Sequence, residues 1–139
     1  MLLAHGKKIL YNLYVRIIQY FLLATEGEIS VNENEIFAKM QSEKFSDNNG
    51  VILRAIHIGV PKYTNLSHLK TALRSEIDKA DFTDSVNYLF LTGYINIRKM
   101  DSKLPADIAD SSIDDLEAKV STSGIRLLRG KLKDDCVRT

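Results

Sequence analysis

A glycine between a predicted helix and a predicted strand is the feature that most constrains the fold of this chain. Residues 81–92 carry apolar side chains at spacings of three and four, which predicts a helix with one buried face. Residues 94–98, Tyr-Ile-Asn-Ile-Arg, favour a strand. Gly93 lies between them, and glycine permits the sharp backbone turn that such a junction needs. We therefore expect a helix that ends at Gly93 and a strand that begins directly after it.

A second strand and a last helix are predicted further along the chain. After a loop over about 100–113, residues 116–120 alternate apolar and polar side chains, which is typical of a half-buried strand. Ser121 or Thr122 can cap a following helix, and Gly130 is placed to end it. Two strands alone are marginally stable, so we expect this pair to pack against the helices.

These passages resemble those of a known family. Residues 86–95, VNYLFLTGYI, look like the passage with which many bacterial winged-helix regulators leave their third helix and enter the wing. Residues 120–130, VSTSGIRLLRG, resemble the Leu-Thr-x-x-Gly passage that follows the second wing strand in that family. More loosely, the whole chain is similar to small winged-helix proteins of Mu-like prophages. The resemblance implies a DNA-binding transcriptional regulator with a two-stranded β-wing.

In the first half of the chain, the resemblance is limited to the order of the predicted elements. Helices are expected over about 7–25 and 33–45, separated from the next element by a polar loop at 46–50. Residues 51–60 fit either a strand or a short helix, and we favour the helix. A further helix, begun by Asn65 or Ser67, is expected to run to about residue 77.

Together these elements predict an α+β, mostly helical fold. We expect a single winged-helix-like domain over 1–139, with a two-stranded β-wing, an extra helical segment and a short charged tail at 131–139. The 45% content of hydrophobic residues is enough for one core.

Composition narrows the class of protein. The 19 basic residues nearly balance the 18 acidic ones, which argues against a strongly cationic surface but leaves room for a local basic patch. The single cysteine, Cys136, suits a reducing compartment. The amino-terminal apolar stretches are interrupted by polar residues, so we expect neither a signal peptide nor a membrane span. The chain is therefore expected to be cytoplasmic.

The sequence does not suggest an enzyme. The histidines, His5, His57 and His68, are isolated from one another and from Cys136 and lack the spacing of a zinc site. His57 is expected to be partly buried and hydrogen-bonded. The chain has no glycine-rich phosphate loop. We expect no catalytic residue, no metal and no cofactor.

For DNA binding, two helices compete for the position in the major groove. The resemblance implies the helix at 81–92, but its aspartates would repel phosphates. The helix that starts near residue 65 is more basic, although its charges also suit an ordinary solvated surface. The link at 46–79 is longer than is usual in the family, which leaves the choice open. The residues expected to contact double-stranded DNA are Lys62, His68, Lys70, Arg74, Thr83, Asn87, Arg98 and Lys99.

The alternative function is a winged-helix module for protein–protein interaction or dimerisation without DNA binding. The helix at 7–25 is more apolar than one small core needs, so part of it is a candidate interaction surface. A homodimer formed through this helix suits both functions. The residues expected at this dimer interface are Leu10, Tyr14, Ile18 and Leu22.

Overall fold

The computed structural model describes residues 12–19 and 32–139, and the chain divides into two compact units, residues 1–44 and 45–139. In the first unit residues 12–19 are helical and lie within the predicted helix at 7–25, whose remainder falls outside the described residues. The next element, α2 (Glu33–Ile58), begins in the first unit and continues into the second. Arg16 Nη1 donates a hydrogen bond to Glu43 Oε2 at 2.7 Å within the first unit.

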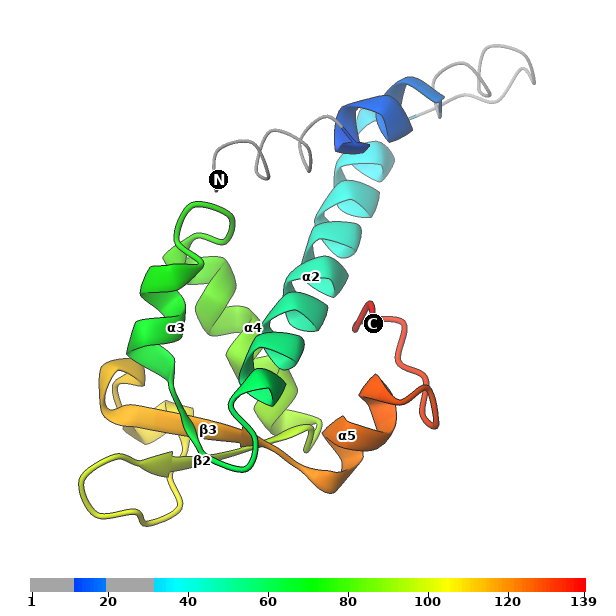
Figure 1. Cartoon of the computed structure of the whole chain (residues 1–139). Helices are drawn as coiled ribbons and strands as arrows, with labels where there is room; N and C mark the ends of the chain where they lie inside the picture. Colours follow the sequence, from blue (N-terminus) through cyan, green and yellow to red (C-terminus); the bar gives the residue numbers. More distant parts are fainter. Residues whose placement is uncertain (1–11, 20–31) are drawn as a thin grey trace. The chain divides into compact units, whose positions relative to one another are not determined.

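The second unit contains the end of α2 and all of the later elements (Figure 1). In chain order these are β1 (Thr64–Asn65), α3 (Leu66–Ala72), α4 (Lys79–Leu91), β2 (Ile95–Lys99), two short 3-10 turns (Ile108–Asp110 and Ile113–Asp115), β3 (Leu116–Val120) and α5 (Thr122–Leu128). The strands form one antiparallel sheet in the order β1-β3-β2. The fold is therefore α+β and mostly helical, as predicted.

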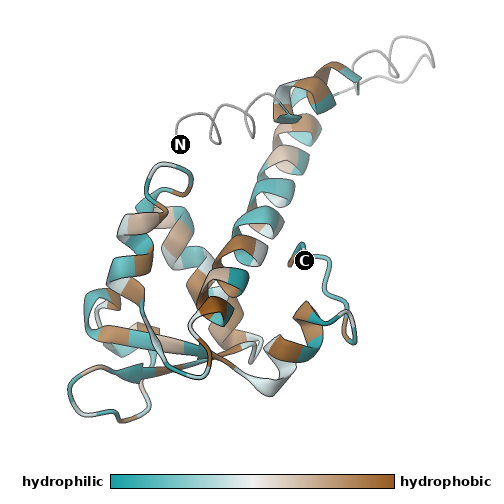
Figure 2. Ribbon diagram, in the orientation of Figure 1, coloured by the Kyte–Doolittle hydropathy of each residue, from teal (hydrophilic) through white to brown (hydrophobic). Residues whose placement is uncertain are grey.

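The core of this unit lies between the sheet and the helices. Alternate strand residues point inward, since Ile95 and Ile97 of β2 are buried while Asn96 is exposed. From the helices, Ile52 of α2, Leu66 of α3 and Phe82 of α4 are fully buried. Hydropathy agrees with this core: the segment that connects β2 to β3 is mostly hydrophilic, and the end of α2 at the sheet is hydrophobic (Figure 2).

Several predicted boundaries are confirmed. Asn65 caps α3, accepting hydrogen bonds from the N–H groups of Ser67 and His68. Ser121 caps α5 by accepting from the Gly124 N–H at 3.2 Å. Strand β3 has the predicted bounds, and the predicted helix and strand around Gly93 correspond to α4 and β2.

Other predictions are wrong. The expected loop at 46–50 lies inside α2, so the helix favoured at 51–60, which is confirmed over 51–58, is the end of α2 and not a separate element. The predicted helix at 65–77 ends at Ala72. The predicted pair of strands is a three-stranded sheet, because Thr64 and Asn65 pair with Ala118 and Glu117 of β3.

The carboxyl-terminal residues bind the polar segment within α2. Asn49 Nδ2 donates to the carbonyl oxygen of Cys136 at 2.8 Å, and the Arg138 N–H donates to the carbonyl oxygen of Ser46 at 3.0 Å. Arg54 Nη1 donates to the carbonyl oxygen of Arg138 at 2.8 Å. We call residues 134–138 the strap.

The strap is also fixed to the core. Val137 is buried, with 5% of its surface exposed. The carboxylate of Asp134 accepts hydrogen bonds from the hydroxyl groups of Tyr88 at 2.7 Å and Tyr94 at 2.8 Å. Residues at the end of the predicted tail therefore form part of the packed unit.

Candidate functional site: the outward face of α4

The outward face of α4 carries a row of polar side chains. Asp78 caps the helix by accepting from the Asp81 N–H at 2.8 Å. Its inward residues, Phe82, Ser85, Val86 and Leu89, are buried. Because residues four apart share a helix face, Lys79, Thr83 and Asn87 lie in one row on the other side.

The row presents polar groups of different kinds. Lys79 and Asn87 are exposed and Thr83 is half-buried. The Thr83 hydroxyl donates to the carbonyl oxygen of Lys79 at 3.0 Å, so its oxygen can still accept a hydrogen bond from a ligand. Asp84 is also exposed beside the row. The face therefore combines an amide, a hydroxyl, a carboxylate and one ammonium group.

The basic surface predicted on α3 is reduced by an ion pair. Lys70 Nζ lies 2.8 Å from Asp114 Oδ1, and the Lys70 side chain is only 21% exposed. The hydrogen bond and positive charge of Lys70 lower the pKa of Asp114 below its usual value. His68 and Arg74 are exposed, but α3 itself spans only Leu66–Ala72.

The hairpin formed by β2 and β3 also uses its charges internally. Glu117 is buried, with 9% of its surface exposed, and it accepts from Arg98 Nε at 2.6 Å and Lys103 Nζ at 3.0 Å. Burial opposes ionisation of Glu117, but these two partners outweigh it and lower its pKa. Arg98 is further held over the ring of Tyr63, 3.6 Å from its centroid. Arg98 thus has a structural role in the sheet.

The predicted DNA-contact residues thus divide into groups. Lys70 and Arg98 are held by carboxylates, while Thr83 and Asn87 belong to the α4 row. The remaining candidates are exposed on other segments, namely Lys62 after α2, His68 and Arg74 at α3, and Lys99 at the end of β2. Lys79 is not among the predicted contact residues, although its spacing of four from Thr83 places it on the same face of the helix.

Of the residues predicted at a dimer interface, only two can be placed. Tyr14 is 63% exposed and Ile18 is 41% exposed, whereas Leu10 and Leu22 lie outside the described residues. Phe37, in the α2 part of the same unit, is 61% exposed. This unit therefore has apolar side chains exposed to solvent.

The histidine, cysteine and carboxylate side chains of the described residues, 12–19 and 32–139, do not form a metal-binding cluster, since no three of them gather as a metal site would require. His57 is half-buried as predicted, but its Nδ1 has no hydrogen-bond partner among the described residues. Cys136 is half-buried within the strap. No helix in the described part of the chain has the length and apolar character to cross a membrane.

Comparison with known proteins does not extend this description: no protein-family model, no curated protein and no solved structure matches the chain.

Proposed function

We propose that residues 45–139 form a winged helix that binds double-stranded DNA, as a small transcriptional regulator of phage or bacterial type does. The order of the elements carries this proposal. A helix, a short strand and two more helices precede a two-stranded hairpin, and the short strand joins the hairpin to give the order β1-β3-β2. Winged helices have this order of elements, and the order supports the proposal together with the resemblance of residues 86–95 and 120–130 to that family.

In this proposal α4 is the recognition helix. It has 13 residues and α3 has 7, which at 1.5 Å per residue gives lengths of about 20 Å and about 10 Å. Asn87 can form two hydrogen bonds with the edge of adenine, and Asp84 can accept one from cytosine. The outward face of α4 therefore suits the reading of base edges in the major groove.

The first test is binding of the full chain to a mixed pool of short DNA duplexes, measured by fluorescence anisotropy. Wild-type protein should bind at about 50 mM salt and more weakly at about 200 mM, because phosphate contacts release counterions. Absence of binding at the lower salt concentration would reject the function.

The second test asks whether α4 reads bases. The preferred duplex is selected from a random pool, and the affinity of Asn87→Ala is then compared with that of wild type. Loss of a bidentate contact with a base should cost about 1–3 kcal/mol and relax the preference at one base pair. Asn96→Ala is the matched control, since Asn96 is exposed on β2 and should leave the preference unchanged.

A second candidate function is pairing with another protein, including a homodimer, through residues of the first unit. The exposed side chains of Tyr14, Ile18 and Phe37 favour it. An apolar contact of this kind should be insensitive to salt. Sedimentation velocity of wild type and Tyr14→Glu tests it: a dimer that dissociates in the variant supports pairing, and a monomeric wild type at high concentration contradicts the homodimer.

A further inference from the structure

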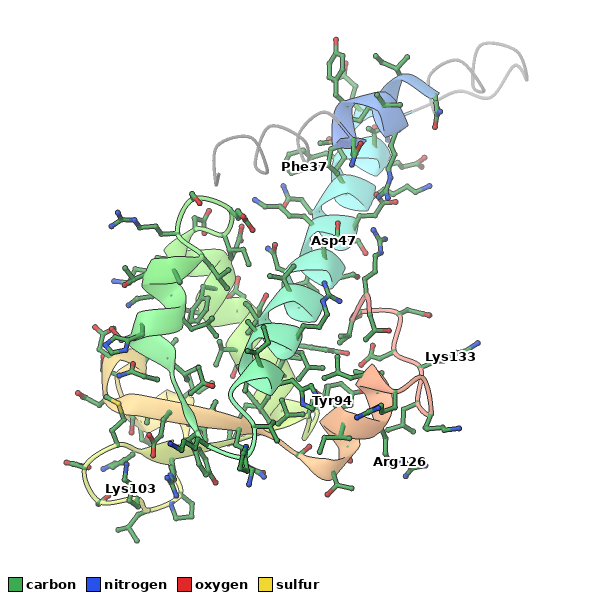
Figure 3. The ribbon with its side chains drawn as sticks, viewed as in Figure 1. Phe37, Asp47, Tyr94, Lys103, Arg126 and Lys133 are labelled. Atoms are coloured by element: carbon green, nitrogen blue, oxygen red, sulfur yellow. The ribbon has the colours of Figure 1, made fainter. Side chains whose placement is uncertain are left out.

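Positive and negative charges lie at different places in the second unit. Residues 95–120, which form the hairpin of β2 and β3, contain six acidic and four basic side chains, a net charge of 4 − 6 = −2. Residues 121–139, which include α5 and the strap, contain five basic and two acidic side chains, a net charge of 5 − 2 = +3. Figure 3 shows the labelled Lys103 of the hairpin at one end of this unit, and Arg126 and Lys133 at the other.

A turn at the end of α5 brings the basic residues together. Gly130 has φ of 74°, the left-handed conformation that glycine adopts without strain. The N–H of Gly130 donates to the carbonyl oxygen of Leu127 at 3.1 Å, and the N–H of Lys131 donates to that of Arg126 at 2.8 Å. This pair of hydrogen bonds is the Schellman motif, which reverses the chain and places Lys131 beside Arg126.

The side chains of this region are available to a ligand. Arg126, Arg129, Lys131 and Lys133 are all exposed, and we call them the α5 patch. Asp134, the nearest acid in sequence, points inward, where it accepts from Tyr88, Tyr94 and the Cys136 N–H. Asp135 is the one exposed acid in the residues from 121 to the end of the chain.

The α5 patch lies next to the proposed recognition helix. Tyr88 of α4 directly follows Asn87 in sequence, and its hydroxyl holds Asp134, the residue after Lys133. At the other end of α5, Ser121 donates a hydrogen bond from its hydroxyl to the carbonyl oxygen of Gly93, just beyond α4. The basic patch is therefore fastened to the carboxyl-terminal half of α4.

The row on α4 has too few basic side chains to bind phosphates by itself. It offers base-reading groups but only one ammonium group, and Asp81 and Asp84 lie on the same helix. Most of the affinity of a DNA-binding protein comes from lysine and arginine contacts with phosphates. The acidic hairpin is poorly suited to supply them.

We infer that the α5 patch binds the DNA backbone beside the groove that α4 enters, and that the hairpin makes no net contribution to phosphate binding. This inference rests on the proposed function, since it assigns the phosphate contacts of the same complex. Arg126 and Lys133 act as positioning contacts that carry no base preference.

Two double variants with the same change in net charge test the inference. Arg126→Gln with Lys133→Gln removes two charges from the α5 patch, and Lys99→Gln with Lys119→Gln removes two from the hairpin without removing a partner of Glu117. Affinity for the mixed duplex pool is measured by anisotropy at several salt concentrations. Log affinity falls with log salt, and each lost phosphate contact should make this negative slope less steep by about 0.9.

The α5 variant should therefore bind more weakly at low salt, and its negative slope should be less steep by about 2. Its deficit relative to wild type should shrink about tenfold between about 50 and 200 mM salt. The hairpin variant should keep the wild-type slope. A less steep slope in the hairpin variant alone, or in neither variant, overturns the inference while leaving DNA binding intact. A wild-type protein that does not bind overturns the proposed function as well.

Discussion

Replacement of Gly50 by alanine should destabilise the protein, although the same change stabilises an ordinary helix. Gly50 lies inside α2, where alanine is normally better than glycine by about 1 kcal/mol. Here Gly50 is buried under the strap, and an added Cβ would overlap the carbonyl oxygen of Arg138. The methyl group must therefore distort the helix or displace the strap.

The size of the effect follows from the contacts that displacement breaks. The Arg138 carbonyl accepts from Arg54 Nη1 at 2.8 Å, and the Arg138 N–H donates to the Ser46 carbonyl at 3.0 Å. A hydrogen bond with a charged donor contributes about 1.5–3 kcal/mol and a neutral one about 0.5–1.5 kcal/mol. After subtraction of about 1 kcal/mol for helix propensity, Gly50→Ala should lower the free energy of unfolding by about 1–3.5 kcal/mol.

A double-mutant cycle separates the strap from helix propensity. Deletion of Arg138 and Thr139 removes the carbonyl that the methyl group would overlap. In that shortened chain Gly50→Ala should be neutral or stabilise by up to about 1 kcal/mol, so the sign of the effect reverses. Urea unfolding followed by far-ultraviolet circular dichroism measures all four proteins. Stabilisation by Gly50→Ala in the full chain would refute the packing of the strap on α2.

Further predictions concern the core, a helix cap and the tyrosine–aspartate cluster. Phe82→Ala, at a fully buried position, should cost about 3–5 kcal/mol in urea unfolding, whereas a cost below about 1 kcal/mol would contradict its burial. Ser121→Ala removes the cap of α5 and should lower stability by about 1 kcal/mol, while Ser121→Thr, which keeps the hydroxyl, should retain most of it; equal losses in both would argue against capping. Burial, then the hydrogen bond to Asp134 and its charge, raise the pKa of Tyr94 to about 12. A raised pKa in the folded state means that this stabilisation is complete below about pH 10 and is lost as the pH rises through about 12. Unfolding measured across that range should show a smaller alkaline loss in Tyr94→Phe than in wild type, and identical losses would contradict the shift.

The elements that depend on neighbouring residues were predictable from the sequence. Strand β3 follows from its own alternation, and α4 follows from its apolar spacing. The caps at Asn65 and Ser121 also use groups two or three residues away, which sequence patterns record.

The elements that were predicted wrongly depend on contacts with residues far away in sequence. Serine, aspartate, asparagine and glycine favour turns, yet residues 46–50 are helical, and their side chains and backbone bind the strap, with Cys136 lying 87 residues from Asn49. The two residues of β1 are too few for a pattern and are defined by their pairing with β3. Such contacts leave no local signal.

The candidate site shows the same limit. The position of Thr83 and Asn87 on one face of α4 was predictable from helical spacing. The sequence predicted that Lys70 adds to a basic surface, but Lys70 pairs with Asp114, which lies 44 residues away and could not be identified as its partner from local spacing. The inward position of Asp134, which leaves the α5 patch basic, likewise depends on Tyr88 and Tyr94.

Nuclear magnetic resonance of the full chain with a short DNA duplex tests the central claim most directly. Amide shifts recorded at low salt should change along α4, most at Thr83 and Asn87, and over residues 126–133. Shift changes confined to the hairpin or to residues 12–19 and 32–44, or no changes at all, would contradict a recognition role for α4.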